Sequence, residues 1–98
     1  MFAVLALLLL PALAGPGETA YIARCSICHA ADGSGRTAKG KKLKLPDLAS
    51  QEVQKQTDAQ LFQIIAQGKD QMPGYAKELG EQKIRDLVAY IRELGKRR

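Results

Sequence analysis

The chain has 98 residues, with 15 lysines and arginines against 10 aspartates and glutamates, so its formal net charge is +5 at pH 7. A segment of this length forms one domain at most, which excludes a multidomain architecture for these residues. It contains no tryptophan and only two phenylalanines, so its own aromatic core is thin. Domains this small often depend on a metal or another staple for stability.

The N-terminal segment predicts an export signal. Residues 2–10 are an unbroken apolar run, and residues 12–14 (Ala-Leu-Ala) have the small-x-small pattern of a cleavage site, which places the mature start near Gly15. A membrane anchor or a buried helix is the alternative, but the run is far shorter than the ~20 apolar residues that span a bilayer. We therefore expect a leader over 1–14, a domain over 15–98, and no stable membrane insertion after cleavage.

The first predicted helix of the domain runs from Glu18 to Cys28, and its acidic start suits the helix dipole. The five residues from position 25 are Cys-Ser-Ile-Cys-His. Cys25, Cys28 and His29 stand at i, i+3 and i+4, so their side chains share one face of a helix. Cys-x-x-Cys-His is the attachment site of a c-type haem, in which the thiols form thioethers and the imidazole binds the iron. We predict a covalent haem at Cys25 and Cys28, with His29 as the proximal ligand.

Other interpretations of the two cysteines fit the sequence less well. Two cysteines in an exported chain usually suggest a disulfide, but these are three apart and followed by histidine. A Cys-x-x-Cys redox centre needs a strand-helix-strand setting, and the sequence has no convincing strand. A structural zinc site needs four ligands, of which cysteine and histidine supply three here, so a carboxylate would have to complete the set.

A long connection over residues 30–46 follows the motif. Gly33, Gly35 and Gly40 break regular structure there, and Pro46 restrains the exit. A loop this long in a small domain is normally functional or wrapped around something. It carries a basic run without an acid, which either steers the protein toward an acidic partner or is simply a solvated loop: Arg36, Lys39, Lys41, Lys42 and Lys44.

Two further helices are predicted from their N-terminal caps. Ser50 caps a short helix that extends to about Gln56. Thr57 and Gln60 form a capping box at the start of the next helix, and Gly68 is suited to end it. The buried side of this second helix is formed by apolar residues, namely Leu61, Phe62, Ile64 and Ile65.

Residues 69–75, Lys-Asp-Gln-Met-Pro-Gly-Tyr, lead to the last helix. Pro73 pushes Met72 toward an extended conformation and out of any helix. A lone methionine is often core filler, but this one lies between turn signals, and its soft thioether can bind haem iron. We therefore predict Met72 as the distal ligand.

The last helix has the clearest pattern in the chain. Gly95 is predicted to end it, and the basic residues 96–98 suit its negative C-terminal end. Apolar residues recur at spacings of three and four, which indicates one buried stripe: Ile84, Leu87, Val88, Ile91 and Leu94.

Together these residues resemble the class I cytochromes c over nearly the whole of 15–98. Cys25, Cys28 and His29 match the haem attachment and proximal positions, and Met72 with its proline matches the distal loop. The resemblance implies an all-α cytochrome c fold, with about four short helices and long loops around one covalently bound haem c. It also implies that the Pro46 carbonyl accepts a hydrogen bond from His29 Nδ1, which would fix the tautomer of the ring.

The resemblance extends to the contact between the terminal helices. Gly17 and Tyr21 resemble the small and aromatic pair of the family's N-terminal helix. Leu87 and Tyr90 resemble their partners on the C-terminal helix.

The function that these features imply is electron transfer rather than enzymatic catalysis. His29 and Met72 together would leave the iron no open position, so the site would move single electrons between redox complexes. We expect a monomer, exported to a bacterial periplasm or, alternatively, a thylakoid lumen. Its partners would be larger redox proteins with acidic docking surfaces, and export separates it from nucleic acid.

Two alternatives to a free carrier stay open. The chain could be a haem-bearing subunit fixed in a dehydrogenase or oxidase complex. It could also be a haem enzyme or ligand sensor with an open distal site, which requires that Met72 does not bind the iron.

Overall fold

The computed structural model describes residues 15–97, so the leader predicted over 1–14 lies outside the described residues. Within that range the chain is helical, and its one pairing of extended backbone is an isolated bridge between Lys69 and Met72. The all-α prediction is confirmed, but there are six helices in this range rather than about four: α1 (Glu18–Arg24), α2 (Ser26–His29), α3 (Ala38–Leu43), α4 (Gln51–Gln54), α5 (Asp58–Gln67) and α6 (Ala76–Lys96).

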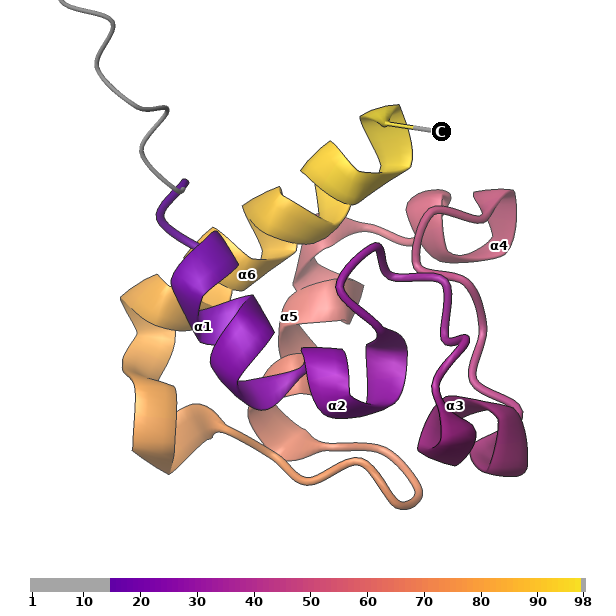
Figure 1. Ribbon diagram of the computed structural model, residues 1–98. Helices are drawn as coiled ribbons and strands as arrows, with labels where there is room; N and C mark the ends of the chain where they lie inside the picture. The colour runs from indigo at the N-terminus through magenta and orange to yellow at the C-terminus, as the bar shows by residue number, and fades with distance from the viewer. Residues whose placement is uncertain (1–14, 98) are drawn as a thin grey trace, which may run out of the picture.

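The core is built on α6, against which α1 and α5 pack (Figure 1). Every residue of the predicted apolar stripe of α6 is buried, which confirms the stripe. Leu61 and Ile65 of α5 face it, and Tyr21 of α1 is 1% exposed. The short helices and the long loops lie on one side of the α1–α6 pair.

The contact between α1 and α6 depends on a glycine and two aromatic rings. A Cβ on Gly17 would lie 2.2 Å from the carbonyl oxygen of Asp86, so no other residue fits without moving a helix. Four residues on, the rings of Tyr21 and Tyr90 have centroids 5.0 Å apart and are tilted by 50°, a favourable aromatic geometry. The predicted pairing of Gly17 and Tyr21 with the C-terminal helix is confirmed, although the backbone that Gly17 approaches is that of Asp86.

The predicted helix from Glu18 to Cys28 is wrong in its extent, because the chain turns at Cys25 and divides it into α1 and α2. The hydroxyl of Ser26 donates a hydrogen bond to the Ile22 carbonyl, one turn back. Such a side-chain bond competes with the backbone bond that would continue a helix. The amides of Cys28 and His29 then bond to the Cys25 carbonyl, at 3.2 and 2.9 Å, and begin a new turn.

The connection after the motif contains α3, which the sequence did not predict. Thr37 caps α3 by accepting a bond from the Gly40 amide at 2.8 Å, and its hydroxyl donates to the Cys28 carbonyl at 2.7 Å. Gly40 lies inside α3 and does not break it. A Cβ there would lie 2.2 Å from the Gly35 oxygen and 2.5 Å from the Cys28 oxygen, so this glycine lets α3 approach α2 closely.

The predicted caps of α4 and α5 are confirmed. Ser50 accepts a bond from the Val53 amide at 3.3 Å, and Thr57 and Gln60 form the reciprocal capping box. Gly68 follows α5 with φ of 82°, as expected for a residue that ends a helix.

The end of α6 differs from the prediction. The helix continues through Gly95 to Lys96, and a Cβ on Gly95 would lie 2.6 Å from the Gln54 side chain. Gln54 donates to the carbonyls of Leu48 and Ile91, at 2.7 and 3.0 Å. Gly95 is therefore a packing site for α4 rather than a helix terminator.

Arg92 completes this corner of the fold. Its guanidinium donates to the Gln54 carbonyl at 2.8 Å and to the Gln56 carbonyl. It also forms an ion pair with Asp58 at 2.9 Å. One side chain of α6 thus holds the junction between α4 and α5.

Candidate haem-binding site

One cavity of about 350 Å³ brings together every residue that the sequence assigned to the site. Its lining residues come from the end of α1, from α2, from the segment after α3, from the junction of α4 and α5, and from the loop before α6. The five predicted site residues are among them: Cys25, Cys28, His29, Pro46 and Met72.

The apolar wall of this cavity was not assigned from the sequence. Leu43, the last residue of α3, and Leu45, which follows the left-handed Lys44, line one side of the cavity. Val53, Leu61 and Ile64 line the other side, from α4 and α5. The cavity is thus a mainly apolar slot with thiol, imidazole and thioether groups on its walls.

The two cysteine thiols are free and half-buried in this structure. Burial and, to a lesser extent, the nearby Cys28 thiol together raise the pKa of Cys25 to about 11. The Cys25 thiol is therefore neutral at pH 7 in this fold. This matches a position whose sulfur is placed against an apolar group rather than exposed as a reactive thiolate.

His29 ends α2 and turns into the cavity. Burial lowers the pKa of its imidazole, because the charged form loses hydration. The ring is thus neutral near pH 7, which is the form that binds a metal.

His29 lacks its predicted hydrogen-bond partner in this structure. Its Nδ1 atom is buried and has no hydrogen-bond partner among the described residues, whereas buried polar atoms normally have one. Pro46 lines the same cavity, but its carbonyl does not accept a bond from Nδ1 in this structure. The next residue, Ala30, has a positive φ of 68°, and its carbonyl accepts a 2.6 Å bond from the Tyr21 hydroxyl.

Met72 lies on the loop between α5 and α6, outside any helix, as its proline predicts. Lys69 and Met72 exchange backbone hydrogen bonds of 3.1 and 2.9 Å across a tight turn, in which Asp70 has a φ of 55°. Gly74 is pressed onto α5, because a Cβ there would lie 2.7 Å from the Ala66 oxygen. The loop therefore presents Met72 to the cavity from the wall formed by the end of α5.

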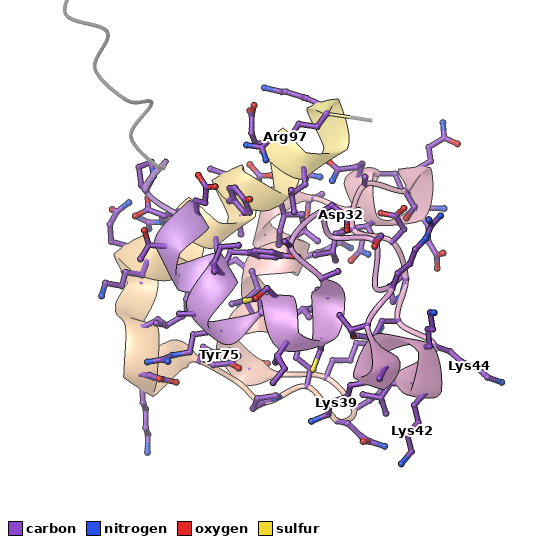
Figure 2. All side chains as sticks on the ribbon, in the orientation of Figure 1. Asp32, Lys39, Lys42, Lys44, Tyr75 and Arg97 are labelled. Carbon is purple, nitrogen blue, oxygen red and sulfur yellow. The ribbon has the colours of Figure 1, made fainter. Side chains whose placement is uncertain are left out.

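Tyr75 closes the cavity next to the attachment motif. Its hydroxyl donates to the Arg24 carbonyl at 3.4 Å, and its amide donates to the Ile65 carbonyl at 2.9 Å. Figure 2 shows Tyr75 beside the end of α1. Burial, and to a lesser extent Cys25 and Glu78, raise the pKa of this phenol, so it stays protonated and can donate.

The donor set fits a covalently attached haem better than a bare metal ion. Among residues 15–97 no group of three His, Cys, Asp or Glu side chains could hold a metal ion. A larger groove of about 520 Å³ between α5 and α6 contains none of the motif residues. Two thiols, one imidazole and one thioether around an apolar slot are the groups that a c-type haem with two axial ligands requires.

The fold and this site together define a small c-type cytochrome. A solved structure, KustC0563 c-type cytochrome, superimposes with a TM-score of 0.74 at 28% identity, and the match covers 80% of this chain and 95% of that one. The all-α cytochrome c fold is thereby confirmed.

Residues 12–91 match the family model described as cytochrome C oxidase, cbb3-type, subunit III, and the chain belongs to this family. It is 31% identical to the cbb3-type cytochrome c oxidase subunit FixPc of Rhizobium leguminosarum bv. viciae, over 87% of this chain and 29% of that protein. It is 34% identical to the cytochrome c subunit of a quinone alcohol dehydrogenase from Gluconacetobacter polyoxogenes, over 79% of this chain and 18% of that protein. The chain spans less than a third of the length of these relatives.

The domain therefore carries haem c and serves in electron transfer. Over the described range, none of the helices has both the length and the apolar character needed to cross a membrane.

Proposed function

We propose that the chain transfers single electrons through a haem c that Cys25 and Cys28 hold as thioethers, with His29 and Met72 as axial ligands. The observation that carries this proposal is the single cavity lined by all four side chains. When bound, the haem supplies one-electron chemistry at its iron. His29 and Met72 would bind the iron in both oxidation states, so that little rearrangement would accompany transfer.

The Met72 thioether and the cavity walls act on the reduction potential in the same direction. A neutral thioether from Met72 favours ferrous iron. Leu43, Leu45 and Val53 provide an apolar wall, which disfavours the additional positive charge of ferric iron. A hydrogen bond from His29 Nδ1 to the Pro46 carbonyl would orient the ring, and both groups already line the cavity.

The surface near the cysteines fits docking to an acidic redox partner. Ile27, between the two cysteines, is 74% exposed, and Ile22 is 47% exposed. Lys39, Lys42 and Lys44 extend from α3 and its C-terminal end into solvent (Figure 2). An apolar centre with a cationic rim supports brief, charge-steered encounters with a partner of opposite charge.

We favour a monomeric carrier, and a subunit of a larger complex is the second proposal. The small domain with its one proposed haem site supports the carrier. The relatives, which are named as oxidase and dehydrogenase subunits, support the subunit. Purification of the protein from the membrane and supernatant fractions of its native cells distinguishes the two proposals. A carrier elutes alone, whereas a subunit co-purifies with its complex.

We also propose export to a bacterial periplasm by a leader over residues 1–14. Mass spectrometry of the purified protein tests this. A chain that starts near Gly15 supports export, whereas a chain that still carries residues 1–14 contradicts cleavage of a leader.

Replacement of Met72 tests the ligand assignment. The oxidised protein is expected to show a sulfur-to-iron charge-transfer band in the near infrared, and Met72→Ala to lose it. The variant should also have a lower reduction potential and gain carbon monoxide binding in the reduced state, since its iron has an open position. Gln71→Ala, which changes the adjacent residue, is the matched control and should keep the band. Tight carbon monoxide binding by the unmodified protein would instead support a haem enzyme or sensor.

A further inference from the structure

Arg24, the last residue of α1, contacts the chain after Met72 through both its backbone and its side chain. Its carbonyl accepts the 3.4 Å bond from Tyr75. Its Nε atom forms an ion pair of 2.7 Å with Glu78, in which both side chains are about half exposed, at 46% and 48%. Arg24 also directly precedes Cys25, so these contacts join the two sides of the cavity beside the attachment motif.

The segment that these contacts hold is separated from the rest of α6 by a kink at Gly80. Gly80 has non-helical angles, φ 77° and ψ 169°, and separates the turn 76–79 from the remainder of the helix. A Cβ on Gly80 would meet no atom within 4 Å, so the kink lies at an open surface position. The turn that carries Glu78 is therefore held by the packing of Leu79 against the core and, on its exposed side, by the ion pair with Arg24.

On its other side, the Met72 loop is fixed to α5. The Tyr75 amide bonds to the Ile65 carbonyl at 2.9 Å. A Cβ on Gly68 would lie 2.5 Å from the Met72 carbonyl oxygen. The loop that carries Met72 is thus attached to α5 on one side and to Arg24 on the other.

We propose that Arg24, Tyr75 and Glu78 form a clasp that keeps Met72 on the iron, which makes them positioning residues for the distal ligand. The inference rests on the proposed ligation by Met72. An exogenous ligand can bind only when Met72 has left the iron, so its apparent affinity reports the fraction of protein in the detached state. Weakening the clasp raises that fraction without changing any atom that binds the haem.

The experiment is a titration of the oxidised holoprotein with imidazole, followed by loss of the sulfur-to-iron charge-transfer band. Glu78→Gln and Tyr75→Phe should each raise the apparent imidazole affinity about threefold, as expected for the loss of one exposed contact. The double variant should raise it about tenfold if the contacts act independently. Arg24→Glu combined with Glu78→Arg restores an ion pair and should return the affinity toward that of the unmodified protein.

Glu81→Gln is the matched control, because Glu81 forms an exposed ion pair with Arg85 on the same helix and the same charge is removed. It should leave the imidazole affinity unchanged, while urea unfolding of all variants reports any general loss of stability. Equal affinities in Glu78→Gln, Tyr75→Phe and Glu81→Gln would overturn the clasp. Absence of the charge-transfer band in the unmodified protein would instead overturn ligation by Met72, so the two failures are distinguishable.

Discussion

The two sides of the cavity are built by different means. On the proximal side, Cys25, Cys28 and His29 lie in or beside α2, which is connected to the buried contact between α1 and α6. On the distal side, Met72 lies on a loop held by a tight turn, by its backbone attachment to α5 and by the exposed ion pair between Arg24 and Glu78. His29, the proposed proximal ligand, therefore lies in a helix packed on α1, whereas Met72, the proposed distal ligand, lies on a loop.

Glycine illustrates the same difference. Gly17 and Gly40 are needed on the proximal side because a Cβ would collide with a carbonyl oxygen at 2.2 Å in both cases. Gly68 and Gly80 serve the distal side through their backbone angles, with φ of 82° and 77°. Gly17 and Gly40 thus act through close approach alone, whereas Gly68 combines a positive φ with a close approach to the Met72 carbonyl oxygen, at 2.5 Å, so substitutions on the two sides should have different consequences.

Gly17→Val should break the proximal side and have the largest effect. Its side chain would force α1 away from Asp86 and Tyr90, at a cost of about 3 kcal/mol in unfolding free energy, as for severe overpacking. Urea denaturation of the holoprotein measures this. Gly15→Val is the control, because a Cβ on Gly15 meets no atom within 4 Å. Equal midpoints for the two variants would show that the helix contact is not required.

Burial of the proximal thiol can be measured directly in haem-free protein. Since the pKa of Cys25 is raised from 9.0 to about 11, its thiolate fraction near pH 8 should be about 100-fold below that of an ordinary thiol. Alkylation of Cys25 by iodoacetamide, followed by mass spectrometry, should be slow and should accelerate until about pH 11. A rate that levels off near pH 9, the ordinary value, would contradict a buried proximal side.

Gly80→Ala should affect the distal side with the smallest change in stability. The new methyl group has free space, but φ of 77° and ψ of 169° are unfavourable for alanine, which costs on the order of 1–2 kcal/mol. Because this strain acts at the start of α6, imidazole affinity should rise. The contact between Tyr21 and Tyr90 should persist, as near-ultraviolet circular dichroism would show. Unchanged imidazole affinity would mean that the kink and the Met72 loop are independent.

The sequence predicted what depends on neighbours along the chain. The capping box of Thr57 and Gln60, the stripe on α6 and the exclusion of Met72 from a helix by Pro73 are local effects, and the structure contains all three. Gly40 and Gly95 were wrongly predicted to interrupt or end a helix. Both instead allow another segment of the chain to approach closely, which local propensity does not reveal.

The candidate site divides in the same way. Its ligand residues stand in short motifs, so they could be named from the sequence. The wall residues Val53 and Ile64 could not, because only the folded chain shows which side chains of α4 and α5 face the motif. Arg24 and Glu78 were likewise missed, since an ion pair between residues so far apart leaves no pattern in the sequence.

The corner held by Arg92 has a consequence for how this sequence can evolve. Gly95 accommodates the Gln54 side chain, and Arg92 binds the backbone at Gln54 and Gln56. Because Val53 and Gln56 also line the cavity, the residues in the last turns of α6 and those in the cavity wall constrain one another. A lineage that replaced Gly95 with a larger residue would have to change Gln54 as well, so these two positions are expected to vary together among descendants of this chain.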